Sequence, residues 1–470
     1  MSYVPPPGSI PTLDVPSLEG VGSAHLVGIG GAGMSGIARL LVARGVRVSG
    51  SDLKDSRALA DLRSLGALVS VGHRSGQLGT PDVVVVSTAI PERNPELAEA
   101  RMREIPVLAR AQVLAALAEG KRTLAVTGTH GKTTTTSMLA VVMERAGRDP
   151  SYVIGGDLNE VGSGARHGEG RAFVAEADES DGSFLLLSPA VAIVTNVEED
   201  HLDFYRGGRE EIEAAFAAFA GRCELVVACG DDPGVRRALE AAGCGAVTYG
   251  LGDHNGARIE VDGSGSAGRF ALGDGEEVLL DLPVPGIHNL LNAAAVVLVA
   301  RMEGVDPREA TRHLRSFGGV RRRFESRGAA SGVRFVDDYA HHPTEIAATL
   351  AAARGDAVGR LVVVFQPHRY TRTQALWREL GESLAGADVV VVTEVYAAGE
   401  EPIPGVSGRL VADALEASSP GKAVVFLPRR ADVAPVLADR VRDGDVVLTL
   451  GAGDVTTVAD EALALLRGRG

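Results

Sequence analysis

The chain has 470 residues, of which 45% are hydrophobic and 23% are charged, and its formal net charge is −14 at pH 7. Single hydrophobic cores stop growing at ~250 residues, so this length predicts about three domains of an ordinary soluble protein. The acidic balance argues against a nucleic-acid binder or a membrane-surface protein, because both need basic patches. A negative net charge is still compatible with small basic sites that bind phosphate groups.

The sequence predicts neither a secretory signal peptide nor a transmembrane segment. The opening MSYVPPPGSIPTLDVPS has prolines where a signal peptide needs an apolar helix, and no apolar run reaches the ~18 residues needed to span a bilayer. The three cysteines show no CxxC spacing, and their odd number suits free thiols in a reducing compartment. We therefore expect a cytoplasmic protein.

Short apolar runs alternate with alanine- and leucine-rich helical stretches along nearly the whole chain, which is typical of βαβ units and parallel sheets. Buried parallel strands read as continuous apolar runs. Eight segments have this form: HLVGI, DVVVVST, TLAVTG, VAIVTN, ELVVACG, RLVVVFQP, ADVVVVTEV and DVVLTLG. The predicted fold class is α/β.

Two breaks divide this series into predicted domains 1–120, 121–322 and 323–470. The first break follows the helical stretch ARAQVLAALAEG, and the second follows a basic cluster, Arg321 to Arg323. Residues 246–286 show alternation and glycine-rich turns instead, so we expect antiparallel hairpins there, inserted at the end of the middle domain.

A glycine loop follows the first predicted strand. Gly28, Gly30 and Gly33 fit the G-x-G-x-x-G pattern between a strand and a helix, and Asp52 ends the next strand. Such a loop binds a diphosphate at a helix N-terminus, and the acid can bind a ribose hydroxyl. NAD and a UDP-sugar both carry these groups, so the motif leaves the ligand open.

The middle domain opens with a second phosphate-binding pattern. Strand TLAVT runs into Gly128-Thr-His-Gly-Lys132-Thr133 and then a helix. Backbone N–H groups of such a loop surround phosphate oxygens, lysine reaches the β- and γ-phosphates, and the threonine hydroxyl can ligate Mg²⁺. Val126 stands where the usual pattern has its first glycine, so the fit is incomplete. This loop predicts a nucleotide triphosphate site.

Acidic residues follow two further strands of this domain, in the segments Glu176 to Asp181 and Asn196 to His201. Ligands of open α/β sheets lie outside the carboxyl ends of the strands. We expect these segments at the same sheet edge as the phosphate loop, where one or two of their carboxylates would ligate Mg²⁺. Composition does not choose among them.

Taken together, eight segments in this order resemble the Mur ligase family: GIGGAGMSGIA, TGTHGKTTTT, AEADESDGSF, TNVEEDHLD, PGIHNLLNAAA, RRRFE, DDYAHHPTEI and FQPHRYTRT. The resemblance covers nearly the whole chain from about residue 22. It implies a Rossmann-like first domain, a phosphate-loop ATPase domain with an antiparallel β insertion, and a Rossmann-like third domain. The family shares the departure at Val126.

The resemblance also assigns roles to residues. It implies that the UDP-sugar is bound by Gly28, Gly30, Gly31, Gly33, Met34, Ser35, Asp52, Ser87 and Thr88. It implies that ATP is bound by Gly128, Thr129, His130, Gly131, Lys132, Thr133, Thr134, His288, Asn289, Asn292, Arg323 and Asp338. The implied metal ligands are Thr133, Glu176 and His201. The incoming amino acid and the muramyl carboxylate would face Tyr339, His341, His368, Arg369 and Arg372. The catalytic residues would be Lys132, His201, Arg323 and His341.

The implied activity is an ATP-dependent ligation of L-alanine to UDP-N-acetylmuramate, through an acyl phosphate, in peptidoglycan precursor synthesis. Its cofactors would be ATP and Mg²⁺ or Mn²⁺, and its partners small molecules rather than nucleic acid or a membrane. We expect a monomer or a weak homodimer. Asp178, Glu179 and Asp181 become supporting charges in this interpretation.

Three other functions share some of these features. A nicotinamide oxidoreductase would explain the first domain but leaves the GKT loop and the acidic strand ends unexplained. A non-catalytic nucleotide switch leaves the basic, histidine-rich third domain unexplained. A recycling ligase that attaches a tripeptide is the alternative within the family.

Overall fold

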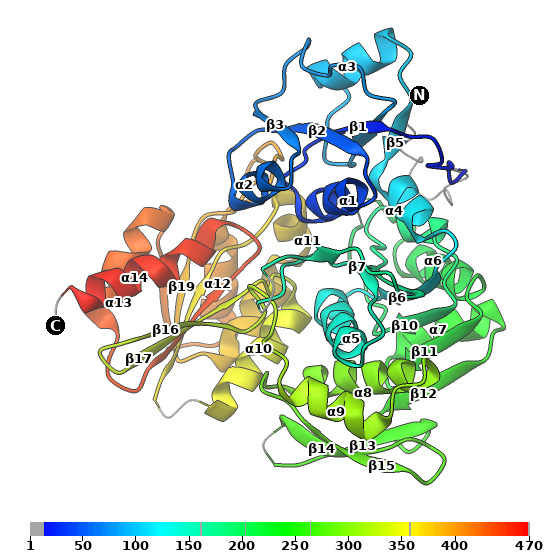
Figure 1. Cartoon of the computed structure of the whole chain (residues 1–470). Coiled ribbons are helices and arrows are strands. Elements are labelled where there is room, and N and C mark those ends of the chain that lie inside the picture. Colours follow the sequence, from blue (N-terminus) through cyan, green and yellow to red (C-terminus); the bar gives the residue numbers. More distant parts are fainter. Residues whose placement is uncertain (1–13, 160–161, 203, 264, 357–358, 469–470) are drawn as a thin grey trace. The chain divides into compact units, whose positions relative to one another are not determined.

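The computed structural model describes residues 14–159, 162–202, 204–263, 265–356 and 359–468, so the proline-rich opening up to residue 13 lies outside the described residues. The described strands form three sheets of five, ten and six strands (Figure 1). The chain divides into two compact units. The first comprises residues up to Glu260, Gly268–Asp281 and Leu291–Gly318, and the second comprises Val261–Ala267, Leu282–Leu290 and the chain from Gly319.

The first sheet is parallel and has the order β3-β2-β1-β4-β5. Its strands are β1 (Ser23–Val27), β2 (Arg47–Asp52), β3 (Leu68–Val71), β4 (Val83–Val86) and β5 (Val107–Ala109). Its helices are α1 (Ala32–Ala43), α2 (Arg57–Ser64), α3 (Pro95–Met102) and α4 (Arg110–Ala118). The strand order reverses between β1 and β4, and ligands of doubly wound sheets bind at such a switch point. The Rossmann-like prediction for this domain is confirmed.

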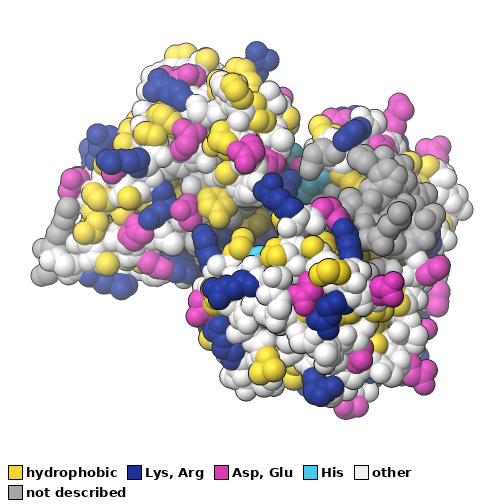
Figure 2. All heavy atoms as spheres, turned by 90° about the horizontal axis from the view of Figure 1, so that it is seen from above, with side chains coloured by type: hydrophobic (Ala, Val, Ile, Leu, Met, Phe, Trp, Pro, Cys, Tyr) yellow, Lys and Arg dark blue, Asp and Glu magenta, His cyan; other side chains and the backbone are white. Residues whose placement is uncertain are grey.

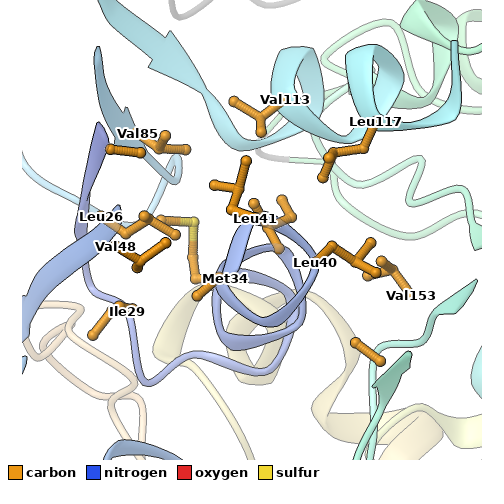
Figure 3. Packing of buried hydrophobic residues seen from close by; sticks show 14 of the residues in the cluster. Leu26, Ile29, Met34, Leu40, Leu41, Val48, Val85, Val113, Leu117 and Val153 are labelled. Carbon is orange, nitrogen blue, oxygen red and sulfur yellow. The ribbon is translucent and has the colours of Figure 1, made fainter. Parts of the chain in front are cut away.

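Helix α1 packs on both sides, which explains its apolar sequence. Met34, Leu40 and Leu41 are buried in one cluster with strand residues of the first sheet and with α4 (Figure 3). On the other side, a Cβ on Gly36 would lie only 3.2 Å from the Val153 side chain of the second sheet. This packing places the first two predicted domains in one compact unit.

The second sheet has the order β15-β14-β13-β12-β11-β10-β6-β9-β7-β8. Its strands are β6 (Arg122–Thr127), β7 (Ser151–Val153), β8 (Ala165–Arg166), β9 (Ala172–Glu176), β10 (Val191–Val194), β11 (Leu225–Cys229), β12 (Ala246–Gly250), β13 (Ala257–Val261), β14 (Ala267–Ala271) and β15 (Glu277–Asp281). Its helices are α5 (Lys132–Arg145), α6 (Arg209–Ala220), α7 (Pro233–Ala242), α8 (Ile287–Met302) and α9 (Pro307–Arg315), with a 3₁₀ turn at Ser183–Leu186. Strand β6 pairs in parallel with β9 and β10.

The predicted antiparallel insertion begins later than residue 246. Strand β12 pairs in parallel with β11, and β13 pairs in parallel with β12. Strands β13, β14 and β15 are consecutive in the chain and adjacent in the sheet, and their side chains alternate between buried and exposed. The alternating pattern identifies a half-exposed strand but not its partner, which explains the misplaced start.

The third sheet has the order β16-β17-β21-β18-β19-β20, and only its edge strand β16 is antiparallel. Its strands are β16 (Glu325–Ala330), β17 (Val333–Asp338), β18 (Leu361–Phe365), β19 (Val389–Val392), β20 (Ala423–Phe426) and β21 (Val446–Leu450). Its helices are α10 (Pro343–Asp356), α11 (Tyr370–Ser383), α12 (Gly408–Ser418), α13 (Val433–Arg440) and α14 (Thr457–Arg467), with 3₁₀ turns at Leu384–Gly386, Arg430–Asp432 and Asp454–Thr456. All eight apolar runs of the sequence form parallel strands in these sheets.

The surface is mixed in character. On the face drawn in Figure 2, acidic and basic side chains are interspersed with hydrophobic ones. Among the described residues, no helix has the length and apolar character required to cross a membrane. The three cysteines are free thiols, as the sequence predicts.

Candidate active site

The glycine loop after β1 turns sharply and is held by the end of β2. Gly28 has φ +78°, and its N–H and that of Ile29 donate to the carbonyl of Ser51. The Gly30 N–H donates to Asp52 Oδ2 at 2.9 Å, and a Cβ on Gly30 would come within 2.9 Å of that oxygen. Asp52 therefore holds the loop in shape, so that the loop leads directly into the N-terminus of α1.

The other predicted UDP-sugar residues lie around this loop with different exposure. Ser87 and Thr88 follow β4 across the switch point, where the Ile90 side chain approaches Gly28. The Met34 side chain is buried in the core (Figure 3), which leaves only its backbone to face a ligand. The Ser35 hydroxyl donates to the carbonyl of Ala32.

The phosphate loop after β6 has a backbone that requires glycine. Gly128 has φ +133°, and a Cβ there would overlap the Thr195 hydroxyl at the end of β10. Gly131 is left-handed at φ +81° and caps α5, which begins at Lys132. The Thr129 and His130 N–H groups donate to the carbonyl and side-chain oxygens of Asn196. The loop is thus fixed against β10, and the α5 N-terminus offers its N–H groups at the loop, as in phosphate sites.

Lys132 lies in an acidic, buried environment. Its Nζ is 2.7 Å from the carboxylate of Glu179 and donates to the carbonyls of Gly128 and Thr129. Burial alone would lower the Lys132 pKa, but the carboxylates of Glu179 and Asp178 outweigh it and raise the pKa. Burial raises the pKa of Glu179 to about 7, although Lys132 opposes this shift. The ammonium is therefore charged and held at the loop.

Glu176 and Thr133 form the second polar contact at this edge. The Thr133 hydroxyl donates to Glu176 Oε1 at 3.0 Å, and the Gly155 N–H donates to its other carboxylate oxygen at 2.7 Å. His201, which follows β10, has φ +54°, and its Nε2 lies 3.8 Å from Glu179 Oε1. The acidic segments after β9 and β10 thus meet at the phosphate loop, which confirms the predicted shared edge.

Helix α8 contributes the predicted asparagines. The Asn292 side-chain oxygen would lie 3.0 Å from a Cβ on Gly131, so this amide lies against the phosphate loop. The Asn289 amide donates to the Pro285 carbonyl at 2.7 Å and holds the first turn of the helix. The imidazole of His288 lies over Gly286.

The third sheet gathers a second group of polar residues at its carboxyl edge. Arg322 and Arg323 lie over the ring of Tyr339, with Cζ 5.0 and 5.1 Å from its centroid. Arg322 donates to the carbonyls of Gly451 and Gly453, whereas Arg323 lies 3.9 Å from Glu345.

Asp338, the predicted ribose ligand, ends β17 and is buried. Its two carboxylate oxygens accept the N–H groups of Phe324 and Ala340 at 2.7 and 2.8 Å. Burial raises its pKa to about 6. Asp338 thus holds the backbone at the residue after Arg323 and at the residue after Tyr339.

The histidines of this edge have defined partners. His341 Nδ1 lies 2.9 Å from the Tyr339 carbonyl, which can only accept, so the hydrogen is on Nδ1. Its Nε2 is then the nitrogen able to accept a proton. The His368 ring stacks on Tyr396 with centroids 5.7 Å apart. Burial and the nearby Arg372 and Arg369 lower the pKa of His368 to about 4, so its ring is neutral at pH 7.

Arg369 and Arg372 differ in backbone setting. Helix α11 begins at Tyr370, and Arg369 stands before it with φ +68° and ψ 137°. Arg369 is the N-cap of this helix, and Arg372 lies three residues further on, in its first turn. Both guanidinium groups still act on His368 electrostatically.

Three residues outside the predicted site have central contacts. Glu179 was assigned only a supporting charge, yet it is the partner of Lys132. Tyr396 stacks on His368. Arg110 lies against Gly33 and 3.4 Å from Asp178. The sequence indicates Glu179, because it belongs to the acidic segment Glu176 to Asp181. It does not indicate Arg110 or Tyr396, because neither belongs to a motif.

Comparison with known proteins gives matches along the whole site. Family matches cover residues 23–122 (Mur ligase family, catalytic domain), 126–300 (Mur ligase middle domain) and 322–453 (Mur ligase, glutamate ligase domain). The UDP-N-acetylmuramate--L-alanine ligase of Kineococcus radiotolerans is 53% identical, over 96% of this chain and 97% of the relative. The crystal structure of UDP-N-acetylmuramate-alanine ligase from Thermotoga maritima is 31% identical, with a TM-score of 0.82 over 95% of this chain and 100% of its own. A murein peptide ligase from Psychrobacter arcticus is 25% identical, with a TM-score of 0.72 over 95% and 99% of the two chains.

Proposed function

Because the chain belongs to the Mur ligase family, we propose that it joins L-alanine to the carboxylate of UDP-N-acetylmuramate at the expense of ATP, in peptidoglycan precursor synthesis in the cytoplasm. The near full-length identity to a relative with this name supports the substrates. The observation in the structure that carries the proposal is the edge where Lys132, Glu179, Glu176 and Thr133 meet around the phosphate loop.

This edge suits the triphosphate of ATP. The Lys132 ammonium is charged and lies at the start of α5. The N–H groups of this helix N-terminus can donate hydrogen bonds to phosphate oxygens, and the helix dipole is positive there. Asn292 lies beside Gly131 on the same side. Phosphoryl transfer needs positioning and charge neutralisation more than covalent help, and these residues supply both.

The residues also fit a divalent cation. Glu176 and Thr133 bring carboxylate and hydroxyl oxygens within 3.0 Å of each other, and such hard donors suit Mg²⁺ or Mn²⁺. We propose that Thr133, Glu176 and His201 hold it, with Gly155 orienting Glu176. When bound, the cation would neutralise charge on the phosphate oxygens.

A carboxylate is a poor electrophile, so the reaction needs activation of the muramyl carboxyl group. In the proposed first step a carboxylate oxygen attacks the γ-phosphorus, the bond to the bridging oxygen breaks, and ADP leaves. The alanine amine then attacks the acyl phosphate carbon, and phosphate leaves with its oxygen. Lys132 would stabilise the transferring group, with Arg323 supplying a further positive charge.

The second step releases a proton from the amine. His341 is the proposed acceptor, because its Nδ1 hydrogen is held by the Tyr339 carbonyl and Nε2 carries the lone pair. Arg369 and Arg372 are planar, permanently charged groups that suit a carboxylate. His368, which stacks on Tyr396, is neutral at pH 7 and adds no further charge.

The test is to trap the intermediate. With ATP and UDP-N-acetylmuramate but no alanine, hydroxylamine should give a hydroxamate at the muramyl carboxyl group, and ATP should show positional isotope scrambling that depends on the muramyl substrate. Initial rates with L-alanine, glycine, L-serine and the peptidoglycan tripeptide then identify the acceptor. A preference for the tripeptide would favour a recycling ligase. Absence of any trapped product, with ADP formed only on an unrelated acceptor, would refute the ligase assignment.

A further inference from the structure

Arg110 occupies a position between the two phosphate-handling parts of the first unit. It is the first residue of α4, the helix that precedes β6. Its guanidinium reaches back to the glycine loop, where a Cβ on Gly33 would overlap Nη1 and lie 3.3 Å from Cδ. A side chain at Gly33 would therefore displace the end of the Arg110 side chain from the glycine loop.

The guanidinium is also held from the other side. Nη2 donates to Asp178 Oδ2 at 3.4 Å, and the two side chains are 29% and 35% exposed. One end nitrogen therefore faces Asp178 and the other faces the glycine loop. A planar guanidinium can serve two partners in this way, because its donors point in fixed, different directions.

The glycine loop itself lacks a cation. Residues 28–36 contain no lysine or arginine, so the loop offers a diphosphate only backbone N–H groups and the positive end of α1. A diphosphate carries about two negative charges at neutral pH, and charge-assisted hydrogen bonds are roughly twice as strong as neutral ones. Arg110 is the charged group that the structure brings to this loop at Gly33.

We propose that Arg110 binds the diphosphate of the UDP-sugar, and that Asp178 is the positioning residue that keeps its guanidinium over the glycine loop. This inference rests on the proposed function, and it adds a binding residue that the motifs do not indicate. Nη1 is directed to the diphosphate, and Nη2 stays with Asp178.

Calorimetric titration without ATP tests the contact. The ligands are UDP, UDP-N-acetylglucosamine, which lacks the muramyl carboxylate, and UDP-N-acetylmuramate. We expect Arg110→Ala to raise Kd at least tenfold for all three by a similar factor, and Arg110→Lys to recover part of the loss. Unchanged Kd values would overturn the proposal, and so would a loss confined to UDP-N-acetylmuramate, since that result assigns Arg110 to the carboxylate.

Arg44→Ala is the matched control. Arg44 caps the opposite end of α1 and donates to the Leu117 carbonyl of α4 at 2.6 Å, so its loss disturbs the same helix pair. We expect this variant to keep its UDP affinity within twofold even if it melts at a lower temperature. An equal loss of affinity in both variants would show that Arg110 acts through helix packing and would refute direct binding.

The positioning role of Asp178 has its own readout. Asp178→Asn should raise the Kd for UDP several-fold, and the Arg110→Ala, Asp178→Asn double variant should bind no worse than Arg110→Ala alone. Additive losses would contradict the role of Asp178. A wild-type protein that binds none of the three uridine nucleotides would refute the proposed function itself, whereas wild-type binding with an unaffected Arg110→Ala refutes only this inference.

Discussion

The Glu179 carboxylate lies 2.7 Å from Nζ of Lys132, with both side chains largely buried at the start of α5. The partner of the phosphate-loop lysine thus comes from the segment after β9, 47 residues further along the chain. Tyr205 donates its hydroxyl to the Glu179 carbonyl at 2.5 Å and holds this segment in place. Glu179 therefore fixes the position of the Lys132 ammonium before a triphosphate binds.

The first prediction concerns Lys132. Because its ammonium would neutralise the transferring phosphoryl group, Lys132→Ala should lower kcat at least ~10²-fold. Its Kd for UDP-N-acetylmuramate, measured by calorimetry, should stay near the wild-type value, since the glycine loop after β1 is separate. A variant that keeps most of its turnover would mean that ATP binds elsewhere.

The second prediction separates the acids after β9. Glu176 contacts Thr133, whereas Glu179 contacts Lys132. Glu176→Ala and His201→Ala should raise the Mg²⁺ concentration needed for half-maximal rate or abolish turnover, and Glu179→Ala should change this requirement less. Rates across a Mg²⁺ titration at saturating ATP provide the measurement. A larger Mg²⁺ effect from Glu179→Ala would identify Glu179 as the metal ligand instead of Glu176.

The third prediction concerns the loop backbone. Gly128→Ala combines an unfavourable φ of +133° with overlap on Thr195, so it should cost at least about 1–3 kcal/mol and abolish ATP turnover. Gly147→Ala, near the other end of α5, also has a positive φ of +71° but meets no atom within 4 Å. It should lower the melting temperature modestly and keep activity. Equal effects of the two variants would contradict the steric argument.

The fourth prediction is a pH dependence in the first domain. Glu96 on α3 is fully buried, accepts the Ser51 hydroxyl at 2.5 Å, and also contacts Gln77 and His73. Burial alone would raise its pKa, but the neighbouring His25 and the hydrogen bonds from Ser51 and Gln77 outweigh it and lower the pKa to about 2.

The sign of the effect follows from this lowered pKa. The charged form is favoured in the folded state, so its contribution to stability is complete above the unfolded pKa of ~4.3 and is lost as pH falls towards 2. Glu96→Gln should therefore melt below the wild type at pH 7, and the difference should shrink between pH 4.5 and 2. Calorimetric scans at several pH values measure it. A difference that is constant over this window would contradict the lowered pKa.

The sequence alone determined the elements and the order of the motifs. Continuous apolar runs such as TLAVTG and DVVLTLG predicted buried parallel strands, because both faces of such a strand are covered. The GKT segment at a strand–helix junction predicted the phosphate loop, since glycine conformation and a helix N-terminus are local properties. Gly28, Gly30 and Gly33 predicted the glycine loop after β1 for the same reason.

Only the tertiary structure decided which side chains meet. Strand β6 lies between β9 and β10, and this order brings Glu179 to Lys132 and Thr195 to Gly128. Arg110 reaches Gly33 across 77 residues because α4 packs beside α1. Strand order, register and helix packing are set by burial of surfaces from distant parts of the chain. A local pattern therefore specifies a loop or a strand, but the partner of a charged side chain depends on the whole fold.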